Sequence, residues 1–164
     1  MVWVSSPAGW GTVDGRLTAE IAPVFVPPTF DAVTTDNGIR ADSTMEQLRA
    51  LKPVFDRKYG SVTAGNSSPL TDGASAVLLM SEERAKELGY VPLAYIRSYA
   101  YAALDPGEQL LMGPVLAAPV ALDRAGLDLK DIDLIEMHEA FAAQVLCNLH
   151  GFESRAWAER AGFA

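Results

Sequence analysis

Two adjacent residues, His138 and Glu139, stand where an apolar run gives way to a helical pattern. The run LIEM precedes them, and apolar residues recur after them at the spacing of a helix. A histidine at such a junction can donate a hydrogen bond to a carbonyl oxygen, and the dipole of the following helix favours negative charge there. The residues alone also fit a structural histidine, with Glu139 as an ordinary partner of the helix dipole.

The single cysteine, Cys147, is the only thiol that could act as a nucleophile. A catalytic thiolate needs a histidine or a helix N-terminus beside it, and Cys147 falls roughly two turns or more inside its predicted helix. It points away from an apolar stripe of Phe141, Val145 and Leu149, although His150 follows at i+3. We therefore expect a small packing residue. One cysteine also excludes an internal disulfide and a cysteine-rich zinc site, and fits a reducing compartment such as the cytoplasm.

A polar segment, TAGNSSPLTDG at residues 63–73, offers exposed backbone amides, carbonyls and hydroxyls. It matches neither the Walker nor the dinucleotide-binding glycine pattern, and no lysine follows its glycines to hold a phosphate. By itself it predicts a loop.

Composition excludes several classes of function. Thirteen basic and twenty-one acidic residues give a formal charge of −8, and the basic residues do not cluster, so we expect no nucleic-acid partner and no binding to an anionic membrane. Two separated histidines predict no metal site. No apolar run approaches the roughly 20 residues that cross a bilayer, and no secretory leader is evident at the start. We expect a soluble, uncleaved chain.

The elements that must position these residues follow from breakers and periodicity. Residues 1–42 are rich in proline and glycine and predict an irregular arm, with a brief strand-like EIAPVFV. Ser43 and Glu46 have the spacing of a capping box, and a helix of about nine residues should end before Pro53. Strands are then expected at 74–80, 91–99 and 131–137, alternating with helices from Ser81 to Gly89, from Pro114 or Pro119 to Gly126, and over AFAAQVLCNL. The alternation favours an α/β layered fold.

Three collinear stretches resemble the thiolase family. They read TAGNSSPLTDGASAVLLMSEERAKELG, LLMGPVLAAPVALDRAGL and DIDLIEMHEAFAAQ, and the likeness extends upstream to about Asp14. The chain is most similar to 3-ketoacyl-CoA thiolases of fatty-acid β-oxidation, including the trifunctional-protein β subunit, in which HEAFA replaces the more usual NEAFA. The resemblance implies a thiolase-like fold of helices packed on mixed sheets, here incomplete and with an extended N-terminal arm.

The resemblance also implies an activity and a site. The activity is CoA-dependent thiolytic cleavage of a 3-ketoacyl-CoA to acetyl-CoA and a shortened acyl-CoA, with coenzyme A as substrate and no tightly bound cofactor. His138 would take part in the oxyanion hole that holds the thioester oxygen, and Glu139 would orient its neighbours. Four further residues would contact or line the path of the pantetheine arm: Ala64, Ser68, Met112 and Phe141.

The departures from the family pattern set the remaining expectations. The nucleophilic cysteine, the G-H-P histidine and the C-x-G-G-G cysteine of a thiolase are absent, so the chain alone is expected to be inactive. The pattern divides the chain into 1–42, an arm and loop-domain tail; 43–98, the end of the loop domain and the last strand and helix of the first repeat; and 99–164, the start of the second repeat. Expected partners are an acyl-CoA and either further copies of the chain, a complementing thiolase chain or a β-oxidation multienzyme. A non-catalytic acyl-CoA-binding protein and an assembly subunit remain as alternatives.

Overall fold

The computed structural model describes residues 14–36, 38–40, 42–107 and 109–160, in two units that meet in sequence at Pro69 and Leu70. The stretch MVWVSSPAGWG lies outside the described residues. Each unit is described by itself. In the described part of the chain, no helix is long and apolar enough to cross a membrane.

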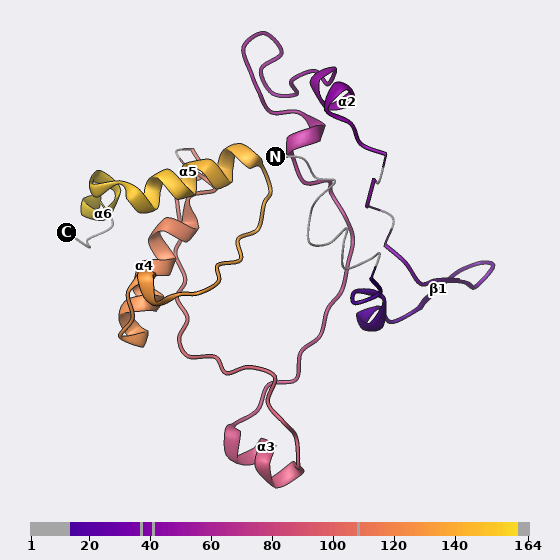
Figure 1. Ribbon diagram of the computed structural model, residues 1–164, viewed down its shortest axis with the longest axis vertical. Helices are drawn as coiled ribbons and strands as arrows, with labels where there is room; N and C mark the ends of the chain where they lie inside the picture. The colour runs from indigo at the N-terminus through magenta and orange to yellow at the C-terminus, as the bar shows by residue number, and fades with distance from the viewer. Residues whose placement is uncertain (1–13, 37, 41, 108, 161–164) are drawn as a thin grey trace. The chain divides into compact units, whose positions relative to one another are not determined.

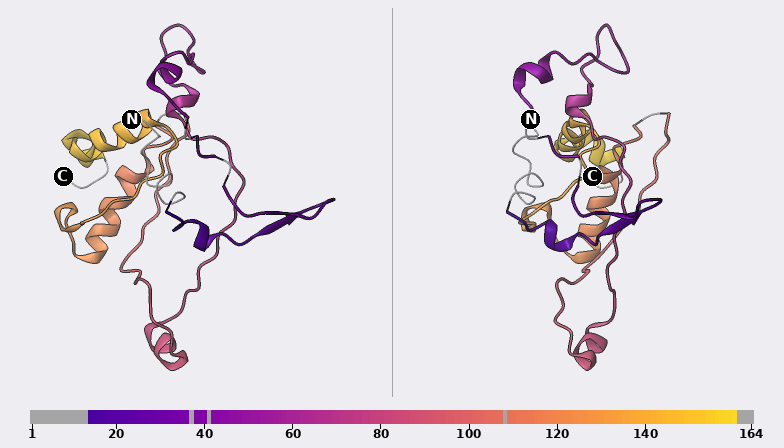
Figure 2. Two further views of the ribbon diagram at one scale, coloured as in Figure 1. Left: turned by 45° about the vertical axis from the view of Figure 1, so that its right-hand side comes forward. Right: turned by 90° about the vertical axis from the view of Figure 1, so that its right-hand side faces the viewer.

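The first unit holds a hairpin and short helical turns. A 3-10 turn, η2 (Thr18–Glu20), precedes strands β1 (Val24–Val26) and β2 (Asp31–Val33), which pair antiparallel with Phe25 opposite Ala32. The two strands form a narrow ribbon (Figure 2). The expected strand-like stretch in the arm is thus confirmed as β1. Helix α2 (Met45–Arg49) and the 3-10 turn η3 (Ala64–Asn66) complete the unit.

The start of α2 corrects the predicted cap by one residue. Thr44, in an extended conformation, is the N-cap, and its hydroxyl accepts from the backbone amide of Gln47 at 3.2 Å. The Gln47 side chain accepts in return from the Thr44 amide at 2.8 Å, which completes a capping box. Ser43 instead donates to the carbonyl of Arg40. The helix is also shorter than expected, at five residues.

The second unit contains the longer helices, in the order α3 (Glu82–Leu88), α4 (Gly113–Ala125), α5 (Ala142–Glu153) and α6 (Arg155–Arg160), with the 3-10 turn η4 (Leu129–Asp131) before α5. Their local signals act as predicted. Ser81 caps α3 through the amide of Arg84, and Gly89 and Gly126 end α3 and α4 in the left-handed conformation, at φ 72° and 67°. Pro114 lies in the first turn of α4, where its missing amide hydrogen costs nothing.

The three strands expected at 74–80, 91–99 and 131–137 do not form. Among the described residues, the only regular strands are those of the hairpin. Large apolar side chains in these segments lie in solvent instead, with Val77 83%, Leu93 104% and Leu134 85% exposed. A strand is stabilised by pairing with a neighbouring strand and by burial of its faces, and within the described chain these segments pair with no strand and leave most of their apolar side chains exposed. The predictions were wrong here because an apolar run favours a strand only where a neighbouring strand is present to pair with it.

The second unit is held together where α4 packs against α5 (Figure 1). Met112 and Val115, at the start of α4, are each 4% exposed and lie against Gly151 of α5. The contact leaves no room for a side chain there, since a Cβ on Gly151 would lie 2.8 Å from the Met112 Cε atom. The contact with α4 buries the face of α5 that carries Asn148 and Gly151. The predicted stripe was therefore misplaced, because Leu149 is half exposed.

Candidate functional site

His138 and Glu139 lie in solvent on the segment that leads into α5. The segment is tied to the helix, because the Gln144 side-chain amide lies 3.7 Å from the sulfur of Met137. Phe141 is the N-cap residue, extended and half buried, and its own side chain makes no cap hydrogen bond. The first amides of a helix have no partner within it, so the end of α5 that follows the His138 segment in the chain is its positive end. An imidazole and a helix N-terminus together suit the stabilisation of an oxygen that gains negative charge.

Met112 lies at the other end of α5. It is the N-cap of α4 and packs on Gly151, which is nine residues beyond Ala142, or about 14 Å along the helix at 1.5 Å per residue. The structure therefore brings Met112 to α5 but does not bring it beside His138.

A hollow of about 340 Å³ opens next to Met112. Its walls include the thiol of Cys147, the imidazole of His150 and the indole of Trp157. Cys147 is exposed, so the expectation of a small packing residue was wrong: the packed face of α5 is that of Asn148 and Gly151. The residues Gln109, Ser154 and Trp157, which also line the hollow, gave no sequence signal because they follow no motif spacing.

Ala64 and Ser68 belong to a separately ordered loop in the first unit. Thr63 organises it, since its hydroxyl accepts from the amide of Gly65 at 3.1 Å and its own amide donates to the Asn66 side chain at 2.8 Å. Ala64 is exposed and Ser68 half buried, so both are accessible on this loop. Gly65 lies close to α2, since a Cβ there would approach a methyl carbon of Leu48 to 2.6 Å and that leucine side chain would have to shift. The sequence presents this glycine only as part of the loop composition.

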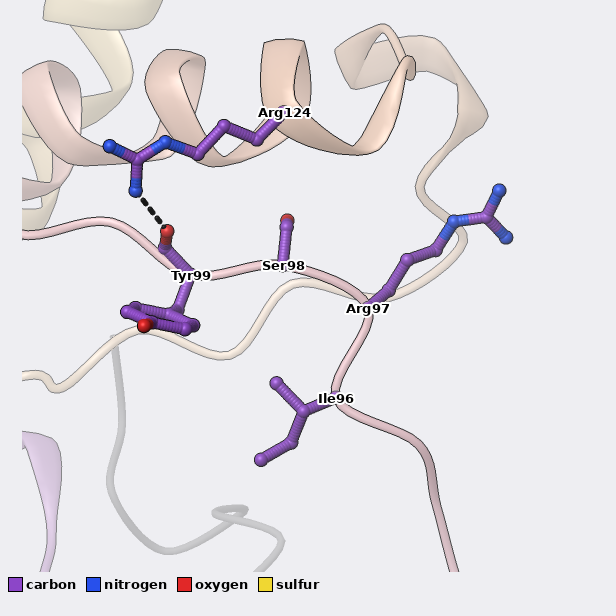
Figure 3. A pocket seen from close by; sticks show the side chains of 5 residues that line it. All are labelled: Ile96, Arg97, Ser98, Tyr99 and Arg124. Carbon is purple, nitrogen blue, oxygen red and sulfur yellow. Dashed lines mark hydrogen bonds between the residues drawn. The ribbon is translucent and has the colours of Figure 1, made fainter. Parts of the chain in front are cut away.

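A second hollow, of about 300 Å³, lies where α4 meets the segment 96–99 (Figure 3). Arg124 donates to the carbonyl of Tyr99 at 2.6 Å, and the Ser98 hydroxyl donates to the carbonyl of Ala121 at the same distance. Arg97 points away from Arg124, so the two guanidinium groups do not converge on one ligand. We interpret this place as a structural tie. No group of three metal-ligating side chains occurs in the described ranges.

The sequence matches two adjoining family profiles. The profile for the thiolase N-terminal domain matches residues 8–83, and the profile for the thiolase C-terminal domain matches residues 90–158. The chain belongs to the thiolase family.

Its relatives within the family are 3-ketoacyl-CoA thiolases. The proteins of that name from Yersinia enterocolitica and Alteromonas mediterranea are each 58% identical to it, over 144 and 145 residues, which is 88% of this chain and 33% of theirs. The chain thus spans about a third of the length of these curated relatives.

Solved structures give the same result for the fold. The chain superposes on human mitochondrial 3-ketoacyl-CoA thiolase with a TM-score of 0.78 and 39% identity, covering 90% of this chain and 37% of that one. A Bacillus anthracis acetyl-CoA acetyltransferase gives 0.81 and 40%, with the same coverage. The human enzyme in complex with CoA gives 0.76 and 38% over 90% of this chain and 36% of that one. The expected thiolase-like fold, present as a partial chain, is confirmed.

Proposed function

We propose that the chain supplies part of the active site of a 3-ketoacyl-CoA thiolase, which cleaves a 3-ketoacyl-CoA with coenzyme A to acetyl-CoA and a shortened acyl-CoA in fatty-acid β-oxidation. One observation carries the proposal. His138 and Glu139, inside the residues that match the thiolase C-terminal domain, are exposed on the short segment that leads into the N-terminus of α5. We propose that the protein acts in the cytoplasm, because its single cysteine is a free thiol and the cytoplasm keeps thiols reduced.

In the proposed site, the imidazole of His138 donates a hydrogen bond to the thioester oxygen, directly or through a water. The N-terminus of α5 adds to the positive potential at that oxygen. Glu139 orients the groups around the imidazole. Phe141 gives an apolar wall to the pantetheine arm, and Met112 lines its path. Ala64 and Ser68 offer polar contacts to the amides of that arm. A few polar groups on apolar walls suit such a long substrate, with coenzyme A as substrate and not as a resident cofactor.

The nucleophile is a separate requirement, because thiolysis passes the shortened acyl group through an enzyme thiol. We assign no such role to Cys147, which lies five residues beyond Ala142 and faces the hollow beside Met112. The dipole of a helix acts within its first turn, so it does not activate this thiol. The nucleophile is proposed to come from thiolase sequence beyond these 164 residues, either continuous with them or on a separate polypeptide.

A complementing partner has its own support. The segments 74–80, 91–99 and 131–137 expose apolar side chains along most of their length in the described chain, and extended apolar segments with free backbone groups recruit neighbouring strands. The proposed partner is a thiolase chain that supplies those strands. Further copies of this chain and a β-oxidation multienzyme are the other forms such an assembly could take. An assembly subunit without turnover is the second candidate function that these segments favour.

Calorimetric titration of the purified chain with acetyl-CoA tests the binding half of the proposal. Saturable heat is expected, weakened about tenfold by His138→Ala through loss of one hydrogen bond. His138→Asn is the matched control, because asparagine is the more usual residue of this motif in the family and keeps a donor. Equal affinities for all three chains would remove His138 from the site.

A second assay separates catalysis from binding. CoA release from acetyl-CoA is measured in the condensation direction, for the chain alone and after mixing with a thiolase polypeptide that carries the nucleophilic cysteine. We expect release only from the mixture, unchanged by Cys147→Ser. Release by the chain alone that the substitution abolishes would make Cys147 the nucleophile, and binding without release in either case would leave an acyl-CoA-binding protein.

A further inference from the structure

Asn148 is a buried polar side chain in the middle of helix α5. None of its surface is exposed. Its side-chain amide donates to the carbonyl of Gln144 on the preceding turn at 2.9 Å and to the carbonyl of Leu111 at 3.0 Å. Its side-chain oxygen meets no donor among the described residues. Burying an amide costs free energy unless it is hydrogen bonded, so the two donated bonds are what stabilise asparagine at this position.

The bond to Leu111 reaches the residue next to Met112. Met112 has little freedom of its own, because its side chain is packed against Gly151 and its backbone carbonyl accepts from Val115 at the start of α4. Asn148 thus joins the start of α4 to the middle of α5, where the two helices lie side by side (Figure 1). At its N-terminus the same helix α5 is preceded by its N-cap Phe141, three residues after His138.

We infer that Asn148 is a positioning residue of the acyl-CoA site, which fixes Met112 relative to the end of α5 that bears Phe141 and His138. The inference rests on the proposed function for its link to acyl-CoA. Met112 and Phe141, which line the proposed substrate path, then lie at the starts of α4 and α5. The hydrogen bond from Asn148 to Leu111 sets the spacing of these two helices. The bond adds a directional restraint to the packing of Met112 and Val115 on Gly151, because a hydrogen bond weakens steeply with misalignment.

The test uses the chain labelled with ¹³C at its methionine methyl groups, with the Met112 signal assigned through Met112→Leu. Asn148→Asp keeps the shape and removes both donors. Asn148→Ser retains a hydroxyl that reaches the carbonyl one turn back but not that of Leu111. Both are expected to move or broaden the Met112 signal while the Met45 signal, from the other unit, stays fixed. Both should weaken acetyl-CoA binding about tenfold by calorimetry, the equivalent of one lost hydrogen bond.

Val115→Ala is the matched control, because it removes packing from the same helix contact and leaves the bond in place. Hydrogen exchange of residues 113–125 measures how far each variant loosens α4. Where Val115→Ala raises the exchange of α4 as much as the Asn148 variants do, it should still bind acetyl-CoA within about twofold of the unsubstituted chain. Equal weakening by Val115→Ala and by both Asn148 variants would overturn the inference, as would an unmoved Met112 signal. If the unsubstituted chain binds no acetyl-CoA, the proposed function and the role of Asn148 in that site both fail, and the Met112 signal still decides whether Asn148 positions Met112.

Discussion

The side-chain amide of Asn148 lies 3.0 Å from the carbonyl oxygen of Leu111, and so links α5 to the turn that leads into α4, 37 residues earlier in the sequence. Around that bond lie Met112, Val115 and Gly151, which are all buried. This small core holds α5, the helix that follows the His138 segment, against the start of α4.

Gly151→Ala should loosen the contact between α4 and α5. The new Cβ would lie 2.8 Å from Met112 Cε and from a methyl of Val115, and such overpacking costs about 1–3 kcal/mol. The better helix propensity of alanine offsets roughly 1 kcal/mol, so a net loss of about 1 kcal/mol is expected. Hydrogen exchange of α4 and α5 amides measures it. Gly113→Ala is the control, since a Cβ there meets nothing within 4 Å and should not raise exchange.

Ser81→Ala should weaken α3 at its N-terminus. The lost bond from the Arg84 amide, 3.2 Å long, is an N-cap worth about 1 kcal/mol. Exchange of the amides in 82–88 should rise, and Ser81→Asp, which keeps an acceptor, should leave it unchanged. A second readout is the pKa of Glu83, which is lowered by the backbone amide of Glu83 and then by the Ser81 hydroxyl. By NMR titration that pKa should rise in Ser81→Ala, and also in Ser81→Asp, because the aspartate carboxylate cannot donate to Glu83 and adds a negative charge beside it.

Acid should release the turn at Asp56. The backbone amides of Tyr59 and Lys58 donate to its carboxylate and hold the pKa of that group below its ordinary value of 3.8. Because the folded pKa is the lower one, the stabilisation is complete above the unfolded value and is lost as pH falls through the folded value, below about pH 4. The amide proton shifts of residues 58 and 59 should follow that titration. In Asp56→Asn the neutral oxygen still accepts, and a persisting titration there would contradict this account.

Arg124→Ala should free the segment next to Tyr99. The guanidinium donates to the carbonyl of Tyr99 at 2.6 Å, and Ser98 gives the only other side-chain tie described between this segment and α4. Exchange of the amides in 98–101 should therefore increase. Arg97→Ala is a matched control, because Arg97 points away from Arg124 (Figure 3). Similar increases in both variants would show that charge, and not the bond, holds the segment.

The chain by itself should associate. Its exposed apolar segments can bury surface only against another polypeptide, so sedimentation should reveal species whose size grows with concentration. Leu93→Glu, in the middle of one such segment, should reduce association. Leu70→Glu changes an equally exposed leucine outside these segments and should not. A monomer with a cooperative thermal transition in dilute solution would contradict the expectation.

The sequence by itself determined the ends of α3 and α4, whereas α5 begins two residues later and ends four residues later than the predicted AFAAQVLCNL, and α6 was not predicted. Ser81, Gly89, Pro114 and Gly126 act through bonds and backbone angles within a turn or so of their own position, so their effect can be predicted without knowing what packs nearby. The family likeness was also present in the sequence, because the motif around His138 and Glu139 is contiguous. The predicted cap of α2 was wrong by one residue. Ser43 and Thr44 are both good N-cap residues, and the backbone conformation determines which of them caps the helix.

Tertiary structure alone decided which residues are buried and whether strands form. No sequence signal marked Asn148, because its bond partner, Leu111, lies 37 residues away. The segments 74–80, 91–99 and 131–137 were predicted as strands from their apolar content, yet a strand needs a neighbour's hydrogen bonds and a covered face, which are not properties of the segment. Local signals fix local geometry, whereas burial and pairing depend on contacts between residues far apart in the sequence.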